Sequence, residues 1–281
     1  MLWQGRRESG NVEDRRGMSG GTMAAGGGIL GVIALVLNFL LGGGSGGSGG
    51  QNTMPPLPGQ QTTQRSAEED QLARFVKVVL ADTEDVWGEL FRKAGESYPP
   101  PTLVLFTGQV QSGCGGATAQ SGPFYCPADQ KLYVDLAFYD ELRTRFGGGG
   151  DFAMAYVVAH EVGHHIQTLM GTSEKMARAR QRLSEEEYNR YSVKMELQAD
   201  FFAGVFAHYQ QGKGYLEAGD IEEALRAANA IGDDNLQKQA QGYAVPESFT
   251  HGTSAQRMFW FKKGFQTGDI NQGDTFSAPD L

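Results

Sequence analysis

The feature of this sequence that most constrains its fold is a long segment without charged residues close to the N-terminus. No Asp, Glu, Lys or Arg occurs from Gly17 to Gln64, and residues 42–50 read GGGSGGSGG. Sixteen of the 40 glycines lie within the first 50 of the 281 residues, without the period of three that a collagen-like repeat requires. Gly/Ser-rich sequence of this kind behaves as a flexible chain. The sequence therefore predicts one folded domain behind an unusual leader.

The rest of the chain has the composition of a globular protein. Hydrophobic residues make up 40% of the sequence and include 16 Phe, 10 Tyr and 3 Trp, which is enough for a sizeable core and excludes a wholly disordered protein. The formal net charge is −9, and residues 51–281 carry 20 basic against 30 acidic side chains. A surface with this excess of negative charge is not expected to bind nucleic acid.

An apolar run inside the charge-free segment predicts a membrane anchor. Met23–Leu41 reads MAAGGGILGVIALVLNFLL, and residues 23–44 are long enough to cross a lipid bilayer as a helix. Four arginines precede the run and the next basic residue is Arg65, an asymmetry that indicates a cytoplasmic N-terminus. The four are Arg6, Arg7, Arg15 and Arg16. We therefore expect a single-pass membrane protein whose folded domain is extracytoplasmic, either periplasmic or at the cell surface; the alternative is a cleaved signal peptide.

These patterns divide the chain into four parts. Residues 1–22 are expected to form a cytoplasmic tail, residues 23–44 the transmembrane helix and residues 45–65 a flexible Gly/Ser/Pro linker. The folded domain is expected at residues 66–281.

The domain itself shows mainly helical patterns. Two short β-prone runs stand at residues 102–106 and 131–136. Helical patterns cover residues 66–94, 151–170, 184–210, 220–231 and 253–264. The expected fold class is α+β, predominantly helical, with a small β-sheet.

The only two cysteines lie 12 positions apart in a loop-like stretch. Cys114 and Cys126 are too few for a structural zinc site with four thiolates, and an extracytoplasmic location favours a disulfide between them. The alternative is two buried thiols that never meet.

The pattern His-Glu-Val-Gly-His at residues 160–164 lies within a strongly helical run. Its spacing places His160 and His164 on one face of a helix, where two imidazoles can bind the same cation. Glu161 lies one step around that face, poorly angled for a third ligand but well placed to take a proton from a metal-bound water. Gly163 is expected to keep bulk away from that water. The alternative is a pair of ordinary histidines on a core or surface helix.

A catalytic zinc site needs a third protein ligand. The third histidine of the longer metzincin pattern is absent, because Gln167 and Met170 stand where that pattern has Gly and His. Glu196 is the best candidate, and Asp200 follows it by one helical turn. Asp200 is expected to accept the free ring N–H of a ligand histidine and to fix its tautomer. A solvated acidic pair, the alternative, is disfavoured by the apolar neighbours of both residues.

At this point the sequence resembles the gluzincin-type neutral zinc metallopeptidases of bacteria and, more closely, the putative neutral zinc metallopeptidase family of membrane-anchored proteins. The resemblance spans about residues 66–276 and rests on four motifs: GPFYCPAD at 122–129, HEVGHH at 160–165, ELQADFFAG at 196–204 and SFTHGTSAQR at 248–257. It implies a zincin-like metallopeptidase domain with one zinc ion per chain. The implied zinc ligands are His160, His164 and Glu196, with Glu161 as general base and acid.

Two residues near the C-terminus are candidates for stabilising the reaction intermediate. His251 lies at a place in chain order where related peptidases have a donor to the tetrahedral intermediate. Arg257 is a second candidate for that role, or a structural partner. The alternatives are that His251 caps the following helix and that Arg257 bonds internally.

The resulting hypothesis is a membrane-anchored zinc endopeptidase that hydrolyses peptide or protein substrates. Zinc activates a water molecule, and Glu161 removes its proton and later delivers a proton to the leaving amine. The strand at Lys131–Leu136 is expected to offer a sheet edge to an extended peptide. Two alternatives remain open: a non-proteolytic membrane-tethered zinc-binding scaffold protein, and an enzyme that hydrolyses a non-peptide amide.

Overall fold

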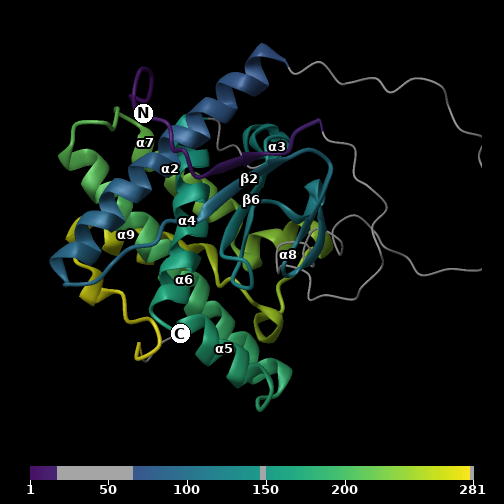
Figure 1. The fold of residues 1–281 in the computed structure, drawn as a ribbon. Helices are drawn as coiled ribbons and strands as arrows, with labels where there is room; N and C mark the ends of the chain where they lie inside the picture. Colours follow the sequence, from purple (N-terminus) through teal and green to yellow (C-terminus); the bar gives the residue numbers. More distant parts are fainter. Residues whose placement is uncertain (18–65, 146–149, 279–281) are drawn as a thin grey trace, which may run out of the picture.

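Helices surround one small mixed sheet in the structure, a computed structural model that describes residues 1–17, 66–145 and 150–278 (Figure 1). The expected class, predominantly helical α+β with a small sheet, is confirmed. The helices of the described residues are α2 (Ala67–Lys93), α3 (Ala137–Arg145), α4 (Asp151–Leu169), α5 (Thr172–Arg180), α6 (Glu185–Gly212), α7 (Asp220–Ala230), α8 (Asp233–Gln241) and α9 (Ser254–Thr267), with short 3-10 turns at Ala119–Ser121, Pro246–Ser248 and Ile270–Gln272.

The sheet has the strand order β1-β2-β6-β5. Its members are β1 (Val12–Asp14), β2 (Thr102–Phe106), β6 (Lys131–Asp135) and β5 (Phe124–Cys126). The first three strands are parallel, and β5 runs antiparallel to β6. A separate hairpin is formed by β3 (Gln109–Ser112) and β4 (Gly115–Thr118). The strand at 131–136 is therefore internal, and the prediction that it offers an edge to a peptide is wrong; β5 lies at the end of the sheet.

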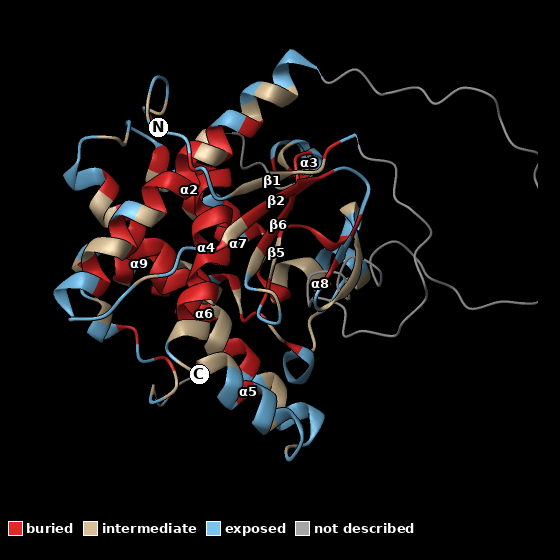
Figure 2. Ribbon diagram, viewed as in Figure 1, coloured by how far each residue is buried: buried red, intermediate tan, exposed pale blue. Residues whose placement is uncertain are grey.

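Alternation along the strands gives the sheet two different buried faces. One face packs against the helices and belongs to the main core; it includes Leu103, Leu105, Leu132 and Val134. The other face packs under the hairpin in a smaller cluster with Val104, Phe106, Val110, Cys126 and Tyr133. Figure 2 shows the buried residues running through α4 and the sheet beside it. The helix with the His-Glu-Val-Gly-His pattern is thus the buried centre of the molecule.

Close helix crossings hold α6 in place. A Cβ at Gly204 on α6 would lie 2.1 Å from the carbonyl oxygen of Phe261 on α9, and one at Gly264 would lie 2.0 Å from that of Phe201. These contacts require glycine on both helices, because any side chain would force the helices apart. The α6–α9 pair forms a rigid support for the residues that α6 presents to α4.

The N-terminal segment is part of this fold rather than a separate tail. Strand β1 pairs with β2 in parallel, with Val12 opposite Leu103. The indole of Trp3 packs edge-on against Phe75, and its Nε1–H donates to Asp151 at the start of α4 (3.1 Å). Figure 1 shows the segment crossing above α2 to reach the edge of the sheet.

The predicted localisation is wrong. The described residues include no helix long and apolar enough to cross a membrane, and residues 23–44, for which the span was predicted, lie outside them. A single crossing there would put residues 1–22 and the domain at 66–281 on opposite sides of a bilayer. Instead residues 12–14 and 102–106 are neighbours in one sheet, so the folded unit includes residues on both sides of the predicted span.

The arginines that indicated a cytoplasmic tail have a different use in the structure. Arg6 pairs with Asp82, and Arg7 pairs with Glu84 and Asp85, all three acids on α2. Arg16, which is buried, pairs with Asp14, Glu69 and Asp70, and Arg15 pairs with Glu13. Acidic residues of α2 thus bind three of the four arginines on which the predicted topology was based.

Candidate metal centre

The metal centre is built by two helices that pack closely. His160 and His164 lie one turn apart on α4, and the centroids of their rings are 4.9 Å apart. Glu196 comes from α6. The helices approach closely at Gly163, where an added Cβ would lie 3.0 Å from both Cα and O of Ala199. The sequence-based expectation that Gly163 clears space for water is wrong, because this glycine faces α6. Its role is to let α6 come near enough to present Glu196.

Three side chains converge on one point. Nε2 of His160 lies 3.1 Å from Oε2 of Glu196, and Nε2 of His164 lies 3.4 Å from Oε1 of the same carboxylate. One ligand atom from each residue lies within 4.8 Å of the others, which is close enough for a single ion. The structure therefore brings together the three residues that the sequence indicated as ligands.

The hydrogen bonds behind the imidazoles decide which nitrogens face that point. Nδ1 of His160 lies 2.8 Å from Oδ1 of Asp200, a carboxylate that can only accept, so Nδ1 carries the proton. Nδ1 of His164 lies 2.8 Å from Oε1 of Gln167, whose Nε2 donates to Met195 O (2.7 Å), so this Nδ1 also donates. Both Nε2 atoms are then lone-pair donors aimed at a carboxylate. Such an arrangement is stable only with a cation or a proton between the groups, and two nitrogens with one carboxylate oxygen suit zinc.

Asp200 is the buried anchor of the centre. It accepts from Tyr156 Oη (2.6 Å) and from Nε and Nη2 of Arg257 (2.8 and 3.0 Å). Burial opposes its ionisation, but Arg257 and His160 outweigh burial and lower the pKa of Asp200 to about 2. Burial also opposes the charge of His160, but Asp200 and Glu196 outweigh it and raise the pKa of His160 to about 10. Protons therefore compete with a metal ion for this site.

Glu161 is buried beside the ligands without joining them. Its side chain is 3% exposed, and burial raises its pKa, although His164 and His160 oppose that change. The nearby backbone N–H of Tyr125 on β5 also opposes the rise in this pKa. A carboxylate whose proton affinity is raised in this way suits a general base.

His251 is held in position by a residue that the sequence analysis did not single out. Asp233, the first residue of α8, accepts the backbone N–H groups of Thr250, His251 and Gly252 at 2.7, 2.6 and 3.0 Å, and its Oδ1 lies 3.2 Å from Nδ1 of His251. Among the described residues, no group forms a hydrogen bond with the other ring nitrogen. Burial would lower the pKa of His251, but Asp233 and then Glu196 outweigh burial and raise it.

Arg257 lies behind the centre. Its guanidinium group contacts Asp200, Tyr156 and the carbonyl oxygen of Ile231, and it forms no hydrogen bond or ion pair with the three converging side chains. This placement matches the structural alternative, in which Arg257 bonds internally. Tyr156 completes the same network, because its hydroxyl donates to Asp200 and accepts from Arg257.

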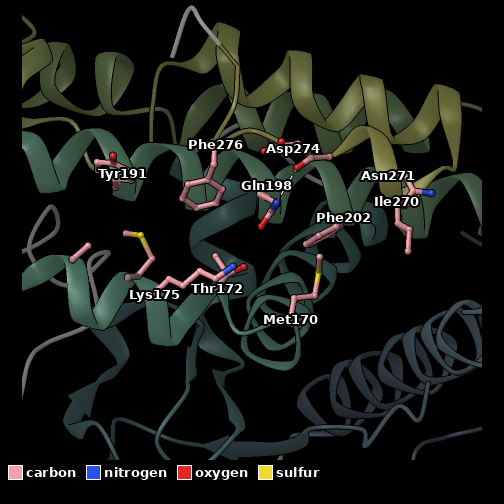
Figure 3. Close-up of a pocket in the computed structure, with 13 residues that line it drawn as sticks. Met170, Thr172, Lys175, Tyr191, Gln198, Phe202, Ile270, Asn271, Asp274 and Phe276 are labelled. Carbon is pink, nitrogen blue, oxygen red and sulfur yellow. Dashed lines mark hydrogen bonds between the residues drawn. The ribbon is translucent and has the colours of Figure 1, made fainter. Parts of the chain in front are cut away.

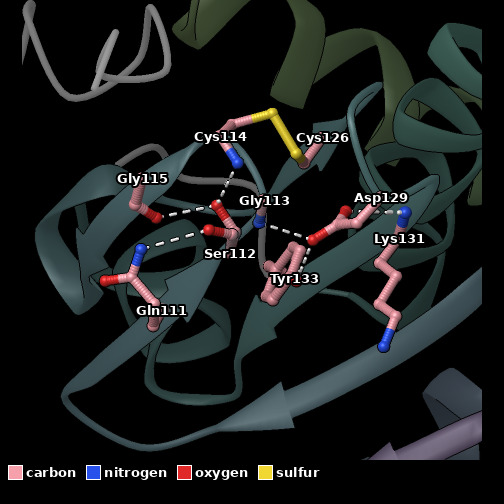
Figure 4. The surroundings of a disulfide bond; sticks show 9 residues. All are labelled: Gln111, Ser112, Gly113, Cys114, Gly115, Cys126, Asp129, Lys131 and Tyr133. Carbon is pink, nitrogen blue, oxygen red and sulfur yellow. Dashed lines mark hydrogen bonds between the residues drawn. A yellow bond between two sulfur atoms is a disulfide. The ribbon is translucent and has the colours of Figure 1, made fainter.

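The predicted disulfide is present between Cys114 and Cys126 (Figure 4). It joins the tip of the β3–β4 hairpin to the end of β5. Asp129 reinforces the junction by accepting from the backbone N–H of Gly113 (2.6 Å) and from the hydroxyl of Tyr133 (2.6 Å). The disulfide thus ties strand β5 covalently to the β3–β4 hairpin.

A cavity of about 530 Å³ lies behind the centre, between α5, α6 and the segment at 270–276 (Figure 3). Gln198 forms part of its wall; its Nε2 donates to Gly273 O (2.9 Å), and its Oε1 accepts from Gln167 (3.2 Å). Because Glu196 and Gln198 are two positions apart on a helix, their side chains leave opposite sides of α6. The cavity is therefore separate from the metal centre.

The site is a candidate His₂Glu centre of the kind found in zinc hydrolases. It has two histidines on one helix, a carboxylate from a second helix and a buried glutamate next to the first histidine. The chain belongs to the putative neutral zinc metallopeptidase family, whose sequence model matches residues 1–276. That match includes the N-terminal segment, which the structure places in the sheet.

Relatives of nearly the same length exist. The uncharacterized protein YpfJ of Escherichia coli (strain K12) is 51% identical over 283 residues, covering 98% of this chain and 99% of YpfJ. The uncharacterized protein Rv2575 of Mycobacterium tuberculosis (strain H37Rv) is 46% identical over 219 residues, covering 74% of this chain and 73% of Rv2575. No solved structure matches the chain.

Proposed function

We propose that this protein is a zinc-dependent endopeptidase. The observation that carries the proposal is the convergence of two imidazole lone pairs and one carboxylate beside a buried glutamate. His160, His164 and Glu196 would hold one zinc ion. Bound zinc supplies a Lewis acid that polarises a carbonyl group and lowers the pKa of a water molecule to about 7.

Glu161 is the proton carrier of the proposed reaction. It takes a proton from the attacking water and delivers it to the nitrogen of the leaving amine. Burial supports this role because it raises the proton affinity of the carboxylate towards the range where both steps are efficient.

His251 is the proposed donor to the carbonyl oxygen as negative charge develops there. The carboxylate of Asp233 raises the pKa of the imidazole and so favours its protonated form, in which the ring nitrogen turned away from Asp233 is available to donate. A fixed donor aimed at developing charge contributes more than one that must reorient during the reaction. Arg257 and Asp200 act behind the ligands by fixing the ring of His160.

Strand β5 is the proposed docking edge for an extended peptide or protein substrate. Among the described residues it ends the sheet and pairs with β6 on one side only, and the hydroxyl of its Tyr125 lies 3.0 Å from Nδ1 of His165 on α4, the helix that contains Glu161. A peptide that adds to this edge by backbone hydrogen bonds would pass next to the general base.

The test uses the full chain, its metal content and its cleavage of a mixture of unfolded proteins and peptides. Glu161→Gln should retain one equivalent of zinc and lose cleavage by at least 100-fold. Glu222→Gln changes an exposed glutamate on α7 and should behave as wild type. A protein that binds zinc and cleaves none of the peptides would instead be a zinc-binding scaffold. A correctly folded protein without affinity for zinc would overturn the proposal.

A further inference from the structure

Two buried glutamines connect a proposed zinc ligand to the C-terminal part of the chain. Gln167 on α4 is 0% exposed, and Gln198 on α6 is 6% exposed. Nε2 of Gln167 donates to Oε1 of Gln198 (3.2 Å), and Oε1 of Gln167 lies 2.8 Å from Nδ1 of His164. At the other end, Nε2 of Gln198 donates to the carbonyl oxygen of Gly273 (2.9 Å). A continuous row of hydrogen bonds therefore runs from Gly273 to the metal centre.

Two backbone carbonyl oxygens fix the direction of every bond in this row. A carbonyl oxygen can only accept, so Gln198 must turn its amide nitrogen to Gly273 and its amide oxygen to Gln167. Gln167 then needs its nitrogen on that side, and the carbonyl oxygen of Met195 requires the same orientation (2.7 Å). Both N–H groups of Gln167 are used in this way, and its oxygen is left to accept from Nδ1 of His164.

Residues 273–276 are held on α6 by further hydrogen bonds. The hydroxyl of Thr275, which is 0% exposed, donates to the carbonyl oxygen of Lys194 (2.6 Å). Nζ of Lys194 donates in turn to the carbonyl oxygen of Phe276 (3.0 Å). Lys194 and Gln198 are one helical turn apart and share a face of α6. Figure 3 shows Gln198 beside this segment, so the amide that reaches Gln167 is anchored at its far end.

Gln167 needs the oxygen of Gln198 because a buried amide has two N–H groups to satisfy. The carbonyl oxygen of Met195 accepts one of them, and Gln198 accepts the other. A buried N–H without an acceptor costs free energy, so without Gln198 the amide of Gln167 would turn toward another partner and carry its oxygen away from His164. A ligand imidazole that loses its outer hydrogen bond holds a metal ion less tightly.

We propose that Gln198 is a positioning residue for His164 and acts through Gln167. The row of amides holds the imidazole in the orientation and tautomer in which Nε2 faces the metal centre. This inference rests on the metal site of the proposed function and does not depend on peptide cleavage.

The experiment measures the zinc affinity of the full chain in a double-mutant cycle. Gln198→Met keeps the length of the side chain, removes both polar groups and should weaken zinc binding about tenfold. Gln167→Met removes the acceptor beside His164 itself and should weaken it about 10- to 100-fold. Because Gln198 acts through Gln167, the double variant should bind zinc as weakly as Gln167→Met alone.

Thr275→Val is the matched control for loss of a buried hydrogen bond. It releases the same segment from α6 at Lys194 and leaves both glutamines in place. Its zinc affinity should stay within about twofold of wild type. Bound Co²⁺ gives a second readout, because its absorption spectrum depends on the arrangement of its ligands. The spectrum should change in Gln198→Met and stay as in wild type in Thr275→Val.

A third readout uses the metal-free protein. The Nδ1–H proton of His164, observed by NMR, should exchange with solvent several-fold faster in Gln198→Met than in Thr275→Val. If Gln198→Met does not fold, Gln198→Asn, whose amide is one methylene shorter, takes its place with the same expected results.

Wild-type zinc affinity in the Gln198 variant would overturn the inference. A tenfold loss of affinity in Thr275→Val would also overturn it, as would additive losses in the double variant. If the wild-type protein binds zinc and cleaves no peptide, the proposed function fails, and the zinc affinities still decide the role of Gln198. If it binds no zinc, the exchange of the His164 proton decides whether Gln198 orders that ring.

Discussion

Oδ1 of Asp200 lies 2.8 Å from Nδ1 of His160, with both side chains buried. The contact orients the first histidine of the metal centre from behind. Arg257 and Tyr156 occupy the rest of the Asp200 carboxylate, so a carboxylate with no exposure to solvent is fully hydrogen-bonded. Orientation of the ligand and stability of the fold are therefore coupled at one residue.

Asp200→Asn should weaken zinc binding about 10- to 100-fold, because an amide holds the His160 ring less firmly and lowers its basicity. It should also destabilise the fold by about 3–5 kcal/mol, since Arg257 is left as a buried charge without its partner. Zinc titration and urea unfolding measure the two effects. Asp140→Asn, at an exposed site on α3, should change neither quantity. Wild-type zinc affinity in Asp200→Asn would show that this contact does not support the ligand.

Gly163→Ala should destabilise the protein by about 1–3 kcal/mol and weaken zinc binding, because the new methyl group pushes α6 and Glu196 away from α4. Gly88→Ala on α2 is the control. A Cβ at Gly88 meets no atom within 4 Å, so the substitution should be neutral or stabilise by up to about 1 kcal/mol through helix propensity. Urea unfolding of both variants measures the difference, and equal behaviour would argue against a tight α4–α6 crossing.

The pH dependence of peptide cleavage should reflect the pKa of His251, which depends on the neighbouring carboxylate of Asp233. Burial opposes the charge of His251, but the neighbouring Asp233 carboxylate outweighs burial and raises its pKa. Because the charged imidazole is the proposed donor, kcat/KM should fall as the pH rises through that pKa. Asp233→Asn removes the carboxylate and lowers the pKa of the imidazole, which moves the alkaline fall to lower pH. His251→Gln should lower kcat about 100-fold and remove the fall.

The reference for these pH profiles is the wild-type enzyme measured with the same peptide. An alkaline fall at the same pH in Asp233→Asn would separate His251 from catalysis.

Trp3→Ala should destabilise the fold by about 2–3 kcal/mol, since Trp3 packs on Phe75 and donates to Asp151 at the start of α4. Leu2→Ala, whose side chain is 54% exposed, should have little effect. The free energies of unfolding in urea give the comparison. If both substitutions are neutral, the N-terminal segment contributes no stability to the domain.

Much of the metal centre follows from local sequence. A spacing of four residues places His160 and His164 on one face of a helix wherever that helix lies in the fold. The apolar neighbours of Glu196 and Asp200, one turn apart on α6, indicate that these two acids do not belong to a solvated face. The strands predicted at 102–106 and 131–136 are present as β2 and β6, because short β-prone runs flanked by turn residues are also a local pattern.

Contacts between distant segments were not predictable. Asp233 reads as an ordinary acid in the first turn of a helix, and only the fold brings it to His251. Tyr125 is one aromatic residue among many until β5 lies against α4. Gly163 shows its function only when α6 crosses beside it.

By itself, the sequence determined which residues form the helical centre, because side-chain direction within a helix depends on spacing alone. The tertiary structure decided what the N-terminal arginines do and where strand β1 lies. The charge pattern of a segment indicates that it can form ion pairs, but it does not show which residues will be its partners. Here acidic residues of α2 bind Arg6, Arg7 and Arg16, and β1 pairs with β2. The N-terminal segment was predicted to lie across a membrane from the folded domain, but it forms a strand of the domain's sheet.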